Sequence, residues 1–192
     1  MGEAALRFLI GLGERIQAAD ILVFRWINLG WAHPTLDTAM GLTTQLGLGW
    51  VQLALLALLY TFGGPTGRRT ALLCMLAFAV SGLIAQILKE GCERVRPGLV
   101  VADYRFLGEQ VLYGSFPSGH TTTSSALARV VAAAYRRWAV LLYLVAALVG
   151  LSRVYVGAHF PTDVLAGTVI GLFTGQASLS EALVRPGRKH NG

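Results

Sequence analysis

The sequence predicts an all-α, polytopic membrane protein: a helix bundle with five transmembrane helices and an N-terminal amphipathic helix or imperfect sixth span. Of the 192 residues, 54% are hydrophobic and only 14% are charged, whereas soluble domains carry about a quarter charged residues. The apolar residues cluster in long uncharged runs, and the charged residues lie mainly between these runs. The same observations exclude disordered, collagen-like and disulfide-scaffold proteins.

Five runs are long enough to cross a hydrocarbon core of about 30 Å. No charged residue occurs between Asp37 and Arg68, and the second run is bounded by Arg69 and Lys89. The third run has a polar first half and contains Arg129, whose side chain we expect to extend toward the membrane surface. The predicted spans are residues 49–62, 70–88, 118–135, 138–156 and 164–179.

The N-terminal segment, residues 1–36, is predicted to lie at the membrane interface as one or two amphipathic helices. Charged residues interrupt its apolar positions, and Trp26 and Trp31 are candidate interface anchors. A sixth, imperfect span centred on residues 21–29 is the alternative, although Arg25 lies within it. Residues 37–183 then form one membrane-embedded domain, and residues 184–192 form a basic cytoplasmic tail.

The distribution of basic residues predicts the orientation, because short loops rich in Lys and Arg face the cytoplasm. One side collects seven basic residues: Arg68, Arg69, Arg136, Arg137, Arg185, Arg188 and Lys189. We therefore expect a multi-pass protein of the cell (inner) membrane, with residues 89–117 and 153–163 at the extracytoplasmic surface. No basic stripe interleaved with aromatic residues accompanies the net charge of +6, so nucleic acid is not an expected partner.

Three clusters of candidate catalytic and binding residues lie at this predicted extracytoplasmic face. They comprise Lys89 and Arg96, then Ser118, Gly119 and His120, and finally Arg153, His159 and Asp163. Three cations, two imidazoles, a hydroxyl group and the amides of a helix N-terminus form a receptor for an anion, and a phosphoryl group suits them best. The ten carboxylates form no cluster with the spacing of metal ligands, so neither a metal nor a cofactor is expected.

The spacing of the clustered residues along the sequence suggests a catalytic role for each. Asp163 follows His159 by four residues, with Pro161 as a plausible first helical residue, so its carboxylate can orient the imidazole of His159 as a nucleophile. His120 can protonate the leaving group and then activate water. The negative charge that develops on the phosphoryl oxygens can be stabilised by the cations Lys89, Arg96 and Arg153. The binding site for these oxygens is completed by Ser118 and Gly119.

Three motifs carry a resemblance to a known family. They read KEGCERVRP from Lys89, PSGH from Pro117 and SRVYVGAHFPTD from Ser152. In these motifs the chain resembles the type 2 phosphatidic acid phosphatase superfamily of integral-membrane lipid phosphatases, which shares its site with vanadium haloperoxidases. The resemblance covers roughly residues 37–180. It implies a phosphohistidine on His159, acid chemistry at His120, no metal, and phosphate contacts from Lys89, Arg96, Ser118, Gly119 and Arg153.

The function expected from these observations is metal-independent hydrolysis of a lipid phosphomonoester or diphosphate. By analogy with bacterial members of the family, the leading substrates are undecaprenyl diphosphate and glycerolipid phosphates such as phosphatidylglycerol phosphate. The motifs bind the phosphoryl group that all candidates share, so the choice of lipid stays open, as does the oligomeric state. The alternatives are a vanadate-dependent oxidase-like protein and a noncatalytic lipid-phosphate-binding membrane protein.

Overall fold

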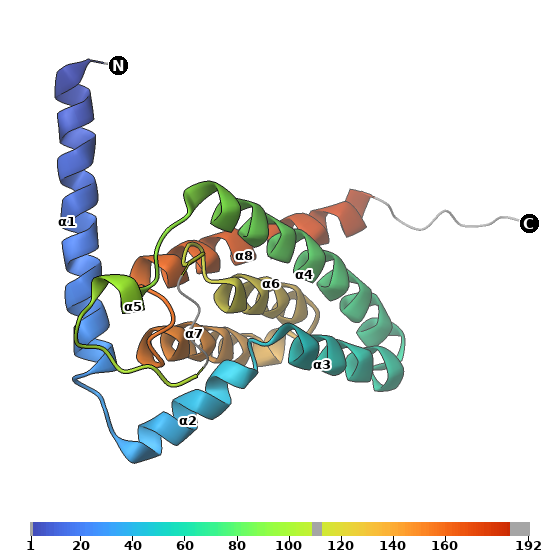
Figure 1. The fold of residues 1–192 in the computed structure, drawn as a ribbon. Coiled ribbons are helices and arrows are strands. Elements are labelled where there is room, and N and C mark those ends of the chain that lie inside the picture. Colours follow the sequence, from blue (N-terminus) through green and yellow to red (C-terminus); the bar gives the residue numbers. More distant parts are fainter. Residues whose placement is uncertain (1, 109–112, 185–192) are drawn as a thin grey trace, which may run out of the picture.

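The structure is a computed structural model that describes residues 2–108 and 113–184, and throughout these ranges its regular elements are helices. In chain order these are α1 (Glu3–Asn28), α2 (Pro34–Gln45), α3 (Gly49–Phe62), α4 (Gly64–Cys92), α5 (Pro97–Val100), α6 (Gly119–Ala134), a 3-10 turn (Arg136–Trp138), α7 (Ala139–Tyr155) and α8 (Pro161–Val184). Helix α6 is central and packs against α4, α7 and α8 (Figure 1). The predicted all-α class is confirmed.

Each predicted span corresponds to a helix of the bundle. Helix α3 has the same bounds as the first predicted span, and α4, α6, α7 and α8 contain or closely match the other four. By length and composition, the stretches Gly64–Val100 and Arg136–Tyr155 can cross a membrane, and α2 with α3, bent by 61°, forms a third candidate. The structure is therefore that of a membrane helix bundle, and the count of five spans stays a prediction.

The two N-terminal helices, α1 and α2, differ from the helices predicted for this segment. Helix α1 is one continuous helix whose first half extends away from the bundle, whereas Phe24 and Ile27 in its second half are buried in the core (Figure 1). Helix α2 is not predicted by the sequence analysis, and the predicted boundary between residues 36 and 37 falls inside it. The predicted basic tail, apart from Val184, lies outside the described residues.

A stripe of glycines brings α8 close to α6. The stripe consists of Gly167, Gly171 and Gly175, which are spaced four residues apart on one face of α8. A Cβ atom on Gly167 would lie 2.8 Å from the Ser118 carbonyl oxygen, and one on Gly175 would lie 2.6 Å from the Ala126 carbonyl oxygen. Because no side chain fits between the backbones, the two helices pack in direct contact, as small residues allow in membrane bundles.

Candidate active site

The three sequence motifs converge at one end of the bundle. The backbone N–H of Ser118, just before α6, donates to the backbone carbonyl of Asp163 in the first turn of α8 over 3.1 Å. A Cβ atom on Gly119 would lie only 3.8 Å from the ammonium nitrogen of Lys89 at the end of α4. Residues from all three motifs are thus neighbours, although they are separated by up to 74 positions in the sequence.

Two predicted phosphate-binding arginines are held by residues that the sequence analysis does not assign to the site. Arg96 donates from Nε to the Tyr113 carbonyl over 3.0 Å and from its terminal nitrogen to the Ala158 carbonyl over 3.2 Å. Arg153 donates to the Thr44 hydroxyl over 2.7 Å, so α2 supports the site. The Nε–H of Arg153 is buried and makes no hydrogen bond to the part of the chain that the structure describes, so it can bind an anion.

His120 lines a small cavity at the start of α6. With Lys89 and Gly119 it borders a space of about 170 Å³ that extends between α3, α4 and α6. Its ring packs on Gly47, where a Cβ atom would lie 2.5 Å from the ring carbon Cδ2. The Ser118 side chain makes no capping hydrogen bond to the first turn of α6. The positive end of this helix can therefore contribute to binding an anion.

His159 is buried in the loop between α7 and α8, and its tautomer follows from one contact. Its Nδ1 lies 2.7 Å from the carbonyl oxygen of Ser115, which can only accept a hydrogen bond. Burial lowers the pKa of His159 to about 4, and Arg153 and Arg96 act in the same direction, whereas Asp163 opposes them. At neutral pH the ring is therefore uncharged, with the hydrogen on Nδ1 and a free lone pair on Nε2.

Asp163 lies beside His159, as the four-residue spacing predicts, but acts on it indirectly. Its Oδ2 is 3.6 Å from Nδ1 of His159, which is beyond hydrogen-bond distance. The same oxygen accepts hydrogen bonds from the Ser115 hydroxyl over 2.6 Å and from the Phe160 backbone N–H over 2.9 Å. The carboxylate thus holds Ser115, whose carbonyl contacts the ring, and also places a negative charge next to the imidazole.

Arg94 is a site residue that the sequence analysis does not identify. Its guanidinium donates to Asp163 over 2.5 Å and to the Thr162 hydroxyl over 2.8 Å. It also donates to Asp20 of α1 over 2.6 Å, and it lies 4.7 Å above the centre of the Phe160 ring. Asp20 in turn accepts from the Thr162 N–H over 2.9 Å. Arg94 therefore links the N-terminal helix to the carboxylate beside His159.

The described part of the long connection after α5 is anchored to the bundle. Arg105 forms an ion pair of 2.5 Å with Asp37, which also accepts a hydrogen bond of 2.6 Å from the Tyr155 hydroxyl. The Asn28 side chain bonds both the backbone N–H and the carbonyl of Arg105, each over 2.8 Å. Residues 109–112 of this connection lie outside the described residues.

The assembled groups can bind and transfer a phosphoryl group. Lys89, Arg96 and Arg153 can supply positive charge for its oxygens, and the lone pair on Nε2 of His159 can act as a nucleophile. His120 supplies a second imidazole that can move a proton. Within residues 2–108 and 113–184, no group of three or more His, Cys, Asp or Glu side chains is arranged to hold a metal ion.

Known proteins resemble the chain in sequence and in fold. Residues 70–181, which include all three motifs, match the PAP2 superfamily. The chain is 34% identical to phosphatidylglycerophosphatase B of Bacillus subtilis (83% of this chain, 77% of that protein) and 30% identical to an undecaprenyl-diphosphatase of Sulfolobus acidocaldarius (85% and 78%). A crystal structure of a transmembrane PAP2-type phosphatidylglycerolphosphate phosphatase from Bacillus subtilis matches with a TM-score of 0.75 and 29% identity, over 96% of each chain.

These matches cover the motifs, the helix bundle and most of each relative. The match to a transmembrane structure agrees with the apolar helices of the bundle, which indicate a multi-pass membrane protein. The family predicted from the three motifs is therefore confirmed. The chain belongs to the PAP2 superfamily.

Proposed function

We propose that the protein is a metal-independent membrane lipid phosphatase that hydrolyses a phosphomonoester or diphosphate in a lipid headgroup through a phosphohistidine on His159. The 2.7 Å contact between His159 Nδ1 and the Ser115 carbonyl carries this proposal. It directs the unprotonated Nε2 away from that carbonyl, on a ring that burial keeps uncharged. A buried, neutral and oriented imidazole is the form of histidine that acts as a nucleophile.

In the first step, Nε2 of His159 attacks the phosphorus atom of the lipid phosphate. A P–N bond forms at the terminal phosphorus atom while the P–O bond from that atom to the rest of the lipid breaks, and His120 donates a proton to the departing oxygen. The positive charge that develops on His159 is stabilised by the carboxylate of Asp163. The oxygens of the phosphoryl group are stabilised by Lys89, Arg96 and Arg153.

In the second step, water releases the phosphate. His120, now deprotonated, accepts a proton from a water molecule whose oxygen attacks the phosphorus atom. The new P–O bond forms as the P–N bond breaks, which yields inorganic phosphate and restores neutral His159. No redox partner or metal is required, since each step only exchanges bonds at phosphorus and moves one proton.

The leading substrates are undecaprenyl diphosphate and a glycerolipid phosphate. Relatives named for activity on each of these compounds share about a third of their residues with this chain. Both compounds present a phosphoryl group at the end of a long hydrocarbon moiety, and a bilayer would deliver that group to the end of the bundle. The choice between them depends on contacts beyond the phosphoryl group.

We further propose that α3, α4, α6, α7 and α8 cross the bacterial inner membrane, with the active site facing the extracytoplasmic side. Arg69 and Ala134 border a common groove, so the α3–α4 turn and the end of α6 lie at the same end of the bundle. A pair of arginines follows each of these segments: Arg68 and Arg69 follow the turn, and Arg136 and Arg137 follow α6. The proposed catalytic groups lie at the other end of the bundle. Basic loops on one side support a cytoplasmic location for that side.

Phosphate release from a panel of lipid phosphates tests the chemistry. The purified full chain in detergent with EDTA should release phosphate from undecaprenyl diphosphate, phosphatidylglycerol phosphate or phosphatidic acid. His159→Ala should lower turnover by several orders of magnitude. His120→Ala should slow the second step, so that an acid-labile phosphoenzyme accumulates from substrates with good leaving groups.

His33→Ala is the matched control, because this exposed histidine caps α2 through the Thr35 N–H and lies outside the site. It should keep wild-type turnover. Near wild-type phosphate release by His159→Ala would contradict the covalent mechanism. Activity that EDTA abolishes and a divalent metal restores would contradict metal independence, and tight lipid-phosphate binding without release would indicate a noncatalytic binding protein.

A further inference from the structure

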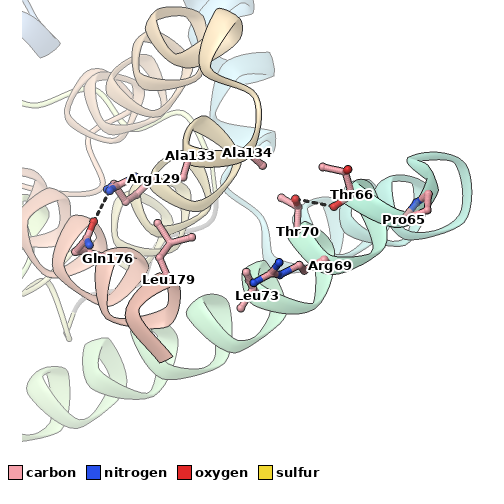
Figure 2. Close-up of a pocket in the computed structure, with 10 residues that line it drawn as sticks. All are labelled: Pro65, Thr66, Arg69, Thr70, Leu73, Arg129, Ala133, Ala134, Gln176 and Leu179. Atoms are coloured by element: carbon pink, nitrogen blue, oxygen red, sulfur yellow. Dashed lines mark hydrogen bonds between the residues drawn. The ribbon is translucent and has the colours of Figure 1, made fainter. Parts of the chain in front are cut away.

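A second concave site lies at the end of the bundle opposite the catalytic residues. It is a groove of about 650 Å³ between α4, α6 and α8, and no residue of the three motifs lines it (Figure 2). We call it the basic groove and define it by Thr66, Arg69, Leu73, Arg129, Ala133 and Leu179. The mechanism proposed above does not use it.

Two arginines line the basic groove from opposite walls. Arg69 extends from α4, and Arg129 lies across the gap on α6, where it donates a hydrogen bond to the neutral amide of Gln176 (Figure 2). Neither arginine forms an ion pair with any of the side chains that the structure describes. The groove therefore brings together two positive charges that have no counterion among the described side chains.

The position of Arg129 makes an anion the appropriate partner. It is half-buried and lies five residues before the last residue of α6, or about 7.5 Å along a helix with a rise of 1.5 Å per residue. In the membrane this places the guanidinium below the end of the helix, near the level of the lipid headgroups. At this level the guanidinium can pair with the anionic headgroup of a lipid.

The apolar walls of the groove favour a lipid over a free anion as its ligand. Leu73 on α4 and Leu179 on α8 provide apolar surface beside the two arginines, and the neighbouring α4 residues Leu72 and Leu76 are exposed on the surface of the bundle. A phosphodiester headgroup between the arginines would leave its acyl chains along this surface. The chain's own basic tail carries charge of the same sign as the groove, so it is a poor occupant.

We propose that the basic groove binds an anionic phospholipid of the leaflet opposite the catalytic face, with the headgroup phosphate between Arg69 and Arg129 and an acyl chain against Leu73 and Leu179. Basic pockets between transmembrane helices bind anionic headgroups in this way. This site is separate from the catalytic site, and its occupancy does not require turnover.

Photolabelling tests the proposal. The full chain is placed in nanodiscs containing phosphatidylglycerol and phosphatidylcholine, one of which carries a diazirine in its acyl chain, and labelled peptides are mapped. The phosphatidylglycerol probe should label peptides that contain Leu73 or Leu179 more strongly than the phosphatidylcholine probe. The double variant Arg69→Gln/Arg129→Gln should reduce this labelling about 30-fold, whereas Arg69→Lys/Arg129→Lys should retain most of it.

A matched control removes the same charge outside the groove. Arg68 stacks over the Tyr60 ring at 5.9 Å and Arg137 over the Trp138 ring at 5.6 Å, so Arg68→Gln/Arg137→Gln should leave the labelling unchanged. An excess of inorganic phosphate should not displace the lipid probe. Equal labelling by the two probes, labelling that survives in the Arg69→Gln/Arg129→Gln variant, or displacement by inorganic phosphate would overturn the proposal.

Discussion

The substitution Asp163→Asn tests how the carboxylate acts on His159. Asparagine keeps the size of the side chain but carries no charge and has only one acceptor oxygen. The native carboxylate accepts hydrogen bonds from Arg94, Ser115 and the Phe160 backbone, and it lies 3.6 Å from Nδ1 of His159. The variant therefore removes a negative charge next to the ring that becomes positive during phosphoryl transfer.

The size of the effect follows from the distance. A unit charge 3.6 Å from a developing imidazolium contributes about 4–5 kcal/mol at an effective dielectric constant of about 20. Arg94, at 2.5 Å from the other carboxylate oxygen, offsets part of this attraction. We therefore expect a net loss of about 3 kcal/mol of transition-state stabilisation, which corresponds to a roughly hundredfold fall in turnover.

Two measurements separate this effect from a general loss of structure. Phosphate release should fall roughly a hundredfold, while vanadate affinity, measured by thermal shift, should change little because it depends mainly on the cations. Asp37→Asn is the matched control, since Asp37 also pairs with an arginine, and its partners Arg105 and Tyr155 are not among the predicted site residues. Full turnover in Asp163→Asn, or an equal loss in Asp37→Asn, would refute the reasoning.

Three further predictions concern stability, pH and topology. Arg94→Gln leaves two buried carboxylates, Asp163 among them, without their ion pair, and should destabilise the fold by about 3–5 kcal/mol in thermal unfolding experiments. Because burial lowers the folded-state pKa of His159 from 6.5 to about 4, stability should fall by about 3 kcal/mol as the pH drops through that window, and less in His159→Gln. Reporters fused after Arg69 should report cytoplasm and one inserted near Tyr104 the exterior, and the reverse pattern would contradict the orientation.

The helices of the bundle can be predicted from the sequence because the bilayer imposes a length and an apolar composition on them. Helix α3 illustrates this, since it is an almost uninterrupted apolar run with the predicted bounds. Helix α2 lacks such a run. It is short, carries Asp37, and is oriented by tertiary contacts such as the hydrogen bond from Tyr155, so hydrophobic patterning gives no signal for it.

The residues proposed to react can be chosen from the sequence, whereas the residues that support them cannot. Phosphoryl transfer demands particular side-chain types, and the three motifs contain these types at definite spacing. Ser115 contacts His159 through a backbone carbonyl, which any residue possesses. Arg94 pairs with carboxylates that lie 69 and 74 positions away, and its own position is one of the six unspecified residues of the first motif. Only the folded structure brings these partners together.

The contact between α6 and α8 connects these observations, because it positions groups at both ends of the bundle. At one end, Gly167 lets α8 approach the Ser118 carbonyl, and the Ser118 N–H reaches the Asp163 carbonyl. At the other end, a Cβ atom on Gly175 would lie 2.9 Å from Cβ of Arg129, so the absence of a side chain there allows this arginine to line the basic groove. Apolar helices gain little from packing on one another within lipid, so close backbone contact is the main source of their affinity. The glycines thus determine the helix spacing on which both the catalytic geometry and the basic groove depend.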